Sequence, residues 1–179
     1  MDTLAVAKLL AAANVPSGNQ KSNEWFNRVD AAYYVRLENF SHFTTREQIP
    51  KILFEFTILG NGGVIGANSV GSDCKVMCGF QSWQLDRAIS YVDAIINGGS
   101  DGLASMDEAT RVNVLQQALE PSAEHDGRSM LSGREAYLFT KETNTASREK
   151  EGKPNFQLIT MKALGDDPDL VNKLTGVPF

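Results

Sequence analysis

The sequence predicts a β-rich α+β fold, a small five-stranded barrel to which a few helices are added. Five segments alternate apolar and polar side chains with the two-residue period of a strand. A segment with helical periodicity separates the third of these strands from the fourth. The chain has 179 residues, of which 42% are hydrophobic and 22% charged, so it is long enough to bury the core of one compact domain.

A short amphipathic helix is expected near the N-terminus. The apolar residues Leu4, Ala7 and Leu10 recur at helical spacing, and Pro16 stops the pattern. We therefore expect a helix over residues 3–13 that docks on the body of the domain.

The first three strands are expected at residues 33–40, 52–59 and 73–80. The second strand places Phe54 and Phe56 on the same face as two isoleucines, so we assign both rings to the core. It ends at a Gly-Asn-Gly-Gly sequence, which is a strong turn signal.

The two cysteines of the chain, Cys74 and Cys78, lie on the third of these strands. Four residues of extended chain separate them by about 13 Å, which is too far for a disulfide or for a shared zinc ion. We expect two small buried thiols in a reducing compartment, the cytoplasm or, for a viral protein, the host cytoplasm. The sequence has neither a secretory signal nor an apolar run that could span a membrane, so no membrane partner is expected.

A helical, acidic insert is expected at about residues 83–126. Ser82 is a candidate cap for its first helix, and Ser105 with Glu108 forms a candidate capping box for its second. Residues 86–126 carry two basic and eight acidic side chains, in a chain whose net charge is −5. Because the acidity is concentrated there, the strands are free to form a neutral or basic face.

The last two strands are expected at 134–142 and 156–164, joined by the polar connector 143–155. The fourth strand has an aromatic and basic face opposite an aliphatic one. The aromatic and basic face consists of Tyr137, Phe139 and Lys141. Its composition leaves open which face is buried; if the aliphatic face is core, the two rings form an exposed pair.

Three strands, a helix and two further strands, in this order, are the elements of the five-stranded Greek-key barrel called the OB-fold. In that fold, the helix between the third and fourth strands plugs one end of the barrel. We expect residues 1–164 to form a single OB-like domain, followed by a short acidic C-terminal tail at 165–179.

Several segments also carry a resemblance to a known family. They are Tyr34-Val35-Arg36-Leu37, Leu53-Phe54-Glu55-Phe56-Thr57-Ile58-Leu59, Cys78-Gly79-Phe80, Leu131-Ser132-Gly133-Arg134 and Gly152-Lys153-Pro154. Across residues 33–164, this pattern resembles the phage-encoded single-stranded-DNA-binding proteins of the OB-fold type. The resemblance implies a role on displaced DNA strands in replication or recombination. The acidic insert is a departure from the family pattern and leaves the register of the last two strands open.

The C-terminal tail supplies a second likeness. Asp166, Asp167 and Asp169 precede a terminal Phe179, similar to the acidic, Phe-ended tails by which single-strand binders recruit replication proteins. The alternative is an ordinary frayed end, because Lys173 and several apolar residues separate the acids from the terminus.

A protein that binds a single strand needs cations for the phosphates and aromatic rings on which bases stack. The candidate nucleic-acid-binding residues are Tyr34, Arg36, Phe43, Arg46, Lys75, Arg134, Tyr137, Phe139, Lys141, Arg148, Lys150 and Lys153. Two alternatives remain open. Tyr34 is equally consistent with a tyrosine at a barrel rim, and the connector cations alternate with Glu149 and Glu151 as in a solvated mixed-charge loop.

The sequence does not indicate an enzyme. It contains no phosphate-binding loop, dinucleotide fingerprint, zinc-hydrolase motif or serine-hydrolase motif, and it has two histidines, His42 and His125. We expect no catalytic residue, metal or cofactor, and we interpret the chain as a non-sequence-specific binder of single-stranded DNA. The alternative is a structural or assembly protein of a virus particle, a homo-oligomer tied together by its N-terminal helix or its tail.

Overall fold

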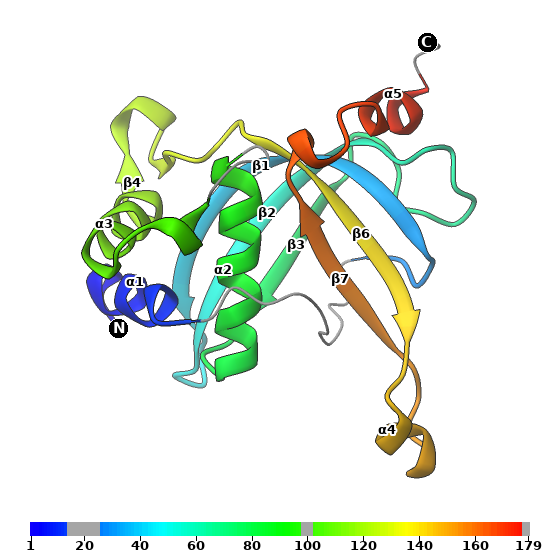
Figure 1. Ribbon diagram of the computed structural model, residues 1–179, viewed down its shortest axis with the longest axis horizontal. Coiled ribbons are helices and arrows are strands. Elements are labelled where there is room, and N and C mark those ends of the chain that lie inside the picture. The colour runs from blue at the N-terminus through cyan, green and yellow to red at the C-terminus, as the bar shows by residue number, and fades with distance from the viewer. Residues whose placement is uncertain (14–25, 98–101, 177–179) are drawn as a thin grey trace.

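The computed structural model describes residues 1–13, 26–97 and 102–176, and its centre is one five-stranded antiparallel sheet (Figure 1). The order of strands across the sheet is β3-β2-β1-β6-β7. The strands are β1 (Ala31–Thr44), β2 (Pro50–Gly60), β3 (Asp73–Cys78), β6 (Glu135–Thr143) and β7 (Phe156–Lys162). The predicted class, α+β with five strands, is confirmed, and each predicted strand overlaps an observed one.

Several helices surround this sheet. They are α1 (Thr3–Ala11), α2 (Ser82–Asn97), α3 (Glu108–Leu119), α4 (Ala146–Lys150) and α5 (Leu170–Thr175). A two-stranded hairpin, β4 (Pro121–Ser122) with β5 (Arg128–Ser129), and short 3-10 turns complete the described elements. No helix in the described ranges has the length and apolar character needed to cross a bilayer.

The prediction of a closed barrel is wrong, because the sheet is open. Among the described residues, β3 and β7 are the two edges and do not pair with each other. Helix α2 lies across one face of the sheet, called here the inner face, and contacts both edge strands (Figure 1). On this helix, the buried Tyr91 donates a hydrogen bond of 2.8 Å from its hydroxyl to the carbonyl of Ile159 on β7. We attribute the open form to this packing, because the helix ties down one edge instead of leaving it free to close.

The core lies between the inner face of the sheet and α2. Its centre is aromatic: the Phe54 ring stacks on Phe40 at 4.8 Å between centroids and meets Tyr91 edge-on at 5.5 Å. Cys74 and Cys78 are buried and free, as the spacing predicts. Burial alternates strictly along β2, which is what a half-buried strand requires.

The N-terminal helix α1 packs against α3 of the insert, on the left of Figure 1. Asp2 caps α1, and its carboxylate accepts a hydrogen bond of 2.7 Å from the backbone N–H of Ala5. The predicted capping box at Ser105 is wrong. Asp107, which has extended backbone angles, caps α3 and accepts from the N–H of Thr110 at 2.9 Å, while Ser105 lies in the preceding 3-10 turn.

The described part of the C-terminal segment, residues 164–176, packs on the opposite, outer face of the sheet. Its 3-10 turn and α5 contact β6, β1 and β2. At Gly60 this approach is very close: a Cβ built there would lie 2.6 Å from the carbonyl oxygen of Leu174, so any larger residue would collide with backbone. The segment is therefore part of the packed domain as far as Gly176.

Candidate nucleic-acid interface

The outer face of the sheet gathers half of the predicted nucleic-acid-binding residues, because strand alternation places them there. Across β1, β6 and β7, the register forms two rows. One row joins Tyr34, Tyr137 and Lys162, and the next joins Ala32, Phe139 and Thr160. The inner face of β6 is aliphatic, with Ala136 and Leu138 buried. The aliphatic face of this strand is therefore the core face, a point that the sequence alone did not decide.

A hollow of about 510 Å³ lies beside the ring of Phe139, and we call it the aromatic hollow. The small side chain of Ala32, directly across from Phe139 on β1, leaves room next to the ring. The residues lining the aromatic hollow are Asp30, Ala31, Ala32, Val64, Phe139, Thr140, Lys141, Leu158, Thr160 and Lys162. The hollow thus combines an aromatic wall, aliphatic sides, two lysines and one carboxylate, that of Asp30.

The two lysines of the aromatic hollow are available to an incoming anion. The ammonium of Lys162 lies 5.5 Å from the centroid of the Phe139 ring, and the side chain of Lys141 is exposed. Neither lysine forms an ion pair with any residue in the described ranges. The carboxylate of Asp30, which lines the same hollow, accepts a hydrogen bond of 2.7 Å from the N–H of Glu142.

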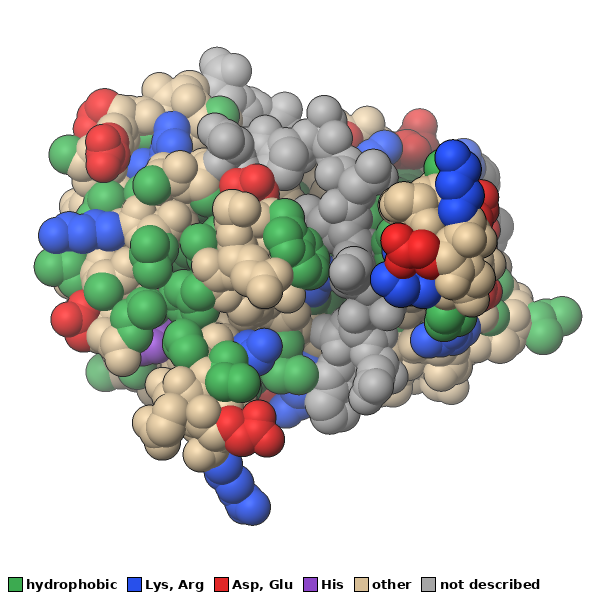
Figure 2. Space-filling view, turned by 90° about the horizontal axis from the view of Figure 1, so that it is seen from below, with side chains coloured by type: hydrophobic (Ala, Val, Ile, Leu, Met, Phe, Trp, Pro, Cys, Tyr) green, Lys and Arg blue, Asp and Glu red, His purple; other side chains and the backbone are tan. Residues whose placement is uncertain are grey.

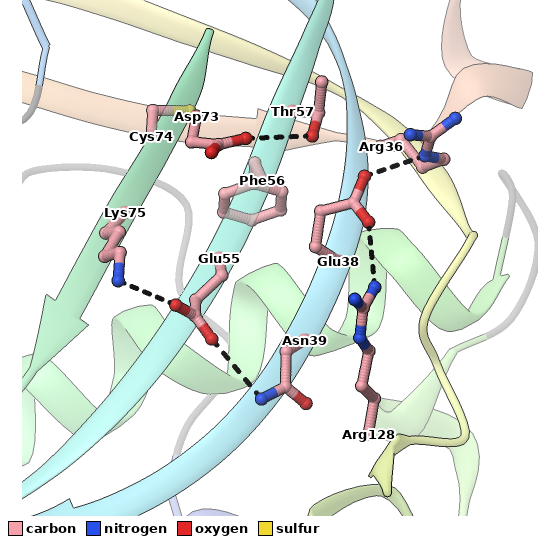
Figure 3. Close-up of a pocket in the computed structure, with 10 residues that line it drawn as sticks. All are labelled: Arg36, Glu38, Asn39, Glu55, Phe56, Thr57, Asp73, Cys74, Lys75 and Arg128. Carbon is pink, nitrogen blue, oxygen red and sulfur yellow. Dashed lines mark hydrogen bonds and ion pairs between the residues drawn. The ribbon is translucent and has the colours of Figure 1, made fainter. Parts of the chain in front are cut away.

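A second hollow, of about 370 Å³, lies on the outer face of β1, β2 and β3, and we call it the charged hollow (Figure 3). Glu38 sits between two guanidinium groups, those of Arg36 at 2.9 Å and Arg128 at 3.3 Å. Across the hollow, the ammonium of Lys75 lies 2.8 Å from the carboxylate of Glu55. Each of these three cations therefore already has a carboxylate partner.

The ionisation of Glu38 follows from these contacts. Partial burial acts to raise the pKa of its carboxyl group, but the hydrogen bond and positive charge of Arg36, together with Arg128, outweigh burial and lower the pKa below its ordinary value. At neutral pH, Glu38 is consequently an anion that neutralises two arginines.

Tyr34 and Tyr137 do not form an open stacking platform. The two rings lie 6.4 Å apart, and the hydroxyl of Tyr34 donates a short hydrogen bond to the carboxylate of Glu135. Burial and this carboxylate raise the pKa of Tyr34 to about 12. Tyr137 is 1% exposed, so the prediction that it pairs with Phe139 as an exposed ring is wrong.

The C-terminal segment is the reason for this burial. The hydroxyl of Tyr137 donates to the carbonyl of Asp167 at 2.7 Å and accepts from the N–H of Val171 at 3.1 Å. Asp166, Asp167 and Asp169 thus lie in a segment folded over the tyrosines, whereas Phe179 falls outside the described residues.

Three other predicted residues lie away from both hollows. Arg134 projects to the inner side and donates a hydrogen bond of 3.0 Å to the carbonyl of Ile96 near the end of α2, so it caps a helix. Phe43, which is 37% exposed, lies near the opposite end of β1, and Arg46 is exposed in the β1–β2 turn. These three side chains are not brought together with Phe139.

The connector between β6 and β7 projects from the body and contains α4 (Figure 1). Arg148 is engaged locally: it donates to Asn144 at 3.2 Å and to the carbonyl of Pro154 at 3.0 Å, and its guanidinium lies 5.5 Å from the Phe156 ring centroid. Lys153 pairs with Glu151, and Lys150 is exposed. Figure 2 shows basic and acidic side chains mixed on this projection, which agrees with a solvated mixed-charge loop.

Lys162, Ala32, Val64 and Arg128 are among the residues that line the hollows but were not predicted from the sequence. Lys162 could have been found, because it alternates with Leu158 and Thr160 along a predicted strand. Ala32, Val64 and Arg128 carried no comparable signal, since their places depend on cross-strand register and on loops that return to the sheet.

In the described ranges, no cluster of three histidine, cysteine or acidic side chains is arranged to hold a metal ion. No protein-family model matches the sequence, and no curated protein matches it significantly.

Proposed function

We propose that the protein binds single-stranded nucleic acid, without sequence preference, on the outer face of its sheet. In this proposal a base stacks on Phe139 within the aromatic hollow, and Lys141 and Lys162 hold the phosphates on either side of it. The observation that carries the proposal is a half-buried ring flanked by two cations that form no ion pair with a carboxylate of the described residues.

The shape of the hollow supports this assignment. A base needs an aromatic surface on one side and free space beside it, and the small Ala32 leaves that space directly across from Phe139. Thr160 and Leu158 line the same hollow from β7. They can contact a base without base-specific hydrogen bonds. Binding that relies on stacking and phosphate contacts tolerates any sequence.

The connectivity supports an OB-like interpretation of the sheet. The order β3-β2-β1-β6-β7, with α2 between the third and fourth long strands, is the order expected of an OB-fold that is opened between its two edge strands. OB-folds bind oligonucleotides on the sheet surface and its adjoining loops. The resemblance to phage single-stranded-DNA-binding proteins favours DNA, in replication or recombination, as the setting.

The proposal is tested by fluorescence anisotropy with labelled oligo-dT at 50 and 200 mM salt, with duplex DNA of equal length as the comparison. Binding should be stronger for the single strand and should weaken steeply with salt, because counterions are released from the phosphates. Equal affinity for duplex, or no binding at low salt, would overturn the proposal. Self-assembly without binding would instead indicate a structural protein.

A matched pair of variants locates the site. Phe139→Leu keeps an apolar side chain but removes the stacking surface, so it should weaken binding by about five-fold or more. Phe43→Leu makes the same change in an exposed ring at the far end of β1 and should leave the affinity unchanged. Equal effects of the two substitutions would exclude the aromatic hollow as the site.

A further inference from the structure

The loop between β2 and β3, residues 61–72, exposes three large aliphatic side chains. Val64 is 38% exposed, Val70 57% and Ile65 94%. Single exposed aliphatic residues are ordinary, but several on one loop indicate a contact surface. The loop contains no charged residue, and it projects beyond the sheet at the right of Figure 1.

This loop is anchored to the core by its polar side. The N–H of Asn68 donates to the hydroxyl of the buried Tyr33 at 3.2 Å, and the side chain of Asn61 donates to the carbonyl of Asn68 at 3.0 Å. The side-chain oxygen of Asn68 accepts from the N–H of Asn27 at 2.8 Å. Because these bonds fix the base of the loop, the exposure of its aliphatic side chains is built into the fold.

A β-turn places Ile65 at the tip of the loop. The N–H of Ala67 donates to the carbonyl of Val64 at 3.2 Å, and Gly66 at the third position of the turn has φ +83°. These are the features of a type II turn, which needs glycine at that position. Ile65 occupies the second position, from which its side chain points into solvent.

We propose that Ile65 is a wedge that inserts between two bases of the bound strand, next to the base that stacks on Phe139. This inference rests on the proposed function and names a second contact for the same site. Val64 lines the aromatic hollow, and Ile65 is the next residue along the chain. Aliphatic side chains separate stacked bases in this way in other nucleic-acid complexes.

The charges around the loop favour bases as the occupant. Phosphates are drawn to Lys141 and Lys162 in the hollow, which turns the less polar part of the strand toward the uncharged loop. A backbone turn that is already formed before binding loses little conformational freedom when the ligand arrives.

The test uses oligo-dA that carries one central 2-aminopurine, whose fluorescence rises when its neighbours no longer stack on it. Binding of the wild-type protein should raise this fluorescence. Ile65→Ala should remove at least about half of the rise and weaken the affinity about three-fold or more. Val70→Ala, on the same loop but not adjacent in the sequence to a residue that lines the hollow, is the matched control and should behave as wild type.

The failures of the two proposals are distinguishable. If Phe139→Leu weakens binding while Ile65→Ala leaves both affinity and fluorescence unchanged, the wedge is wrong and the proposed function stands. If the wild-type protein binds no oligonucleotide, both proposals fall. The wedge is also wrong if Ile65→Ala abolishes sedimentation with phosphatidylcholine–phosphatidylglycerol vesicles but does not alter the 2-aminopurine signal, since the loop would then contact a lipid surface.

Discussion

The two hollows on the outer face use the same kinds of residues in opposite ways. In the charged hollow, Arg36, Arg128 and Lys75 each contact a carboxylate. In the aromatic hollow, Lys141 and Lys162 have no such partner among the described residues, and one of them lies over an aromatic ring.

This difference shows that pairing, more than the number of cations, decides where a polyanion can bind. A phosphate that approaches Arg36 or Arg128 must compete with Glu38, which is ionised and fixed on the same strand as Arg36. A phosphate that approaches Lys141 displaces only water and counterions. The hollow with the larger number of cations is therefore expected to be the weaker anion site.

The largest effect is expected from filling the aromatic hollow. Ala32→Leu places a branched side chain opposite Phe139 and should weaken oligo-dT binding by about ten-fold or more, because the stacked base is lost. The measurement is fluorescence anisotropy, and thermal melting checks that the fold is retained. Thr57→Leu makes a comparable change in the charged hollow; a similar loss of affinity there would remove the distinction between the two hollows.

The salt dependence of binding should separate the two sets of cations. Neutralising the pair Lys141 and Lys162 with glutamine should reduce the slope of log affinity against log salt by about 1.4, which is about 0.7 for each lost phosphate contact on a single strand. The matched variant Arg36→Gln with Lys75→Gln should leave the slope nearly unchanged. If the second variant reduced the slope as much as the first, the paired cations would also be phosphate contacts.

Between the two hollows, the tyrosine row should affect stability and not binding. Tyr137→Phe removes a buried hydroxyl that donates one hydrogen bond and accepts another from the C-terminal segment. The free energy of unfolding should fall by about 1 kcal/mol, measured by urea denaturation, while oligo-dT affinity stays the same. A loss of affinity with unchanged stability would place this ring in the interface.

Replacing Glu38 should leave two arginines of the charged hollow without their carboxylate partner, as the lysines of the aromatic hollow are. Glu38→Gln releases two arginines from their carboxylate, so affinity for oligo-dT should rise about two- to five-fold, while stability falls by about 0.5 kcal/mol. Anisotropy and urea denaturation measure the two quantities. The matched variant Glu55→Gln releases Lys75 alone and should give a smaller gain; a fall in affinity in Glu38→Gln would contradict the competition between carboxylate and phosphate.

The smallest expected effect is a pH dependence that also arises from Glu38. Its pKa is lower in the folded protein than its ordinary value of 4.5, so the folded state favours the ionised form. This contribution to stability is present above that value and is lost as the pH falls through the lowered pKa. The difference in urea midpoint between wild type and Glu38→Gln should therefore narrow below pH 4.5, and a constant difference from pH 7 to 3 would exclude this origin.

Most of the secondary structure could be predicted from the sequence because it depends on short-range periodicity. The alternation along β2 and the helical spacing of Leu4, Ala7 and Leu10 locate their elements well. The open form of the sheet could not be predicted from the sequence. It depends on how α2, with the buried Tyr91, packs against two strands that are far apart in the sequence.

The candidate site was predictable only in part. Phe139 and Lys141 follow from strand alternation once the aliphatic side of β6 is known to be buried. The burial of Tyr137 could not be foreseen, because it results from a chain segment about 30 residues away that returns over the sheet. The role of Ala32 could not be predicted from the sequence either, since it lies in the space that its small side chain leaves beside Phe139.

The contact between α2 and the edge strand β7 has a consequence for how copies of the protein behave at high concentration. Exposed sheet edges are templates on which another chain can add a strand, and native proteins protect them with helices or loops. The hydroxyl of Tyr91 holds α2 to the carbonyl of Ile159, so a bulky helix stands beside that edge. Loosening the packing of α2 on β7 would leave this edge more open to cross-molecule pairing, and aggregation would then become a risk for a domain that otherwise keeps its folded shape.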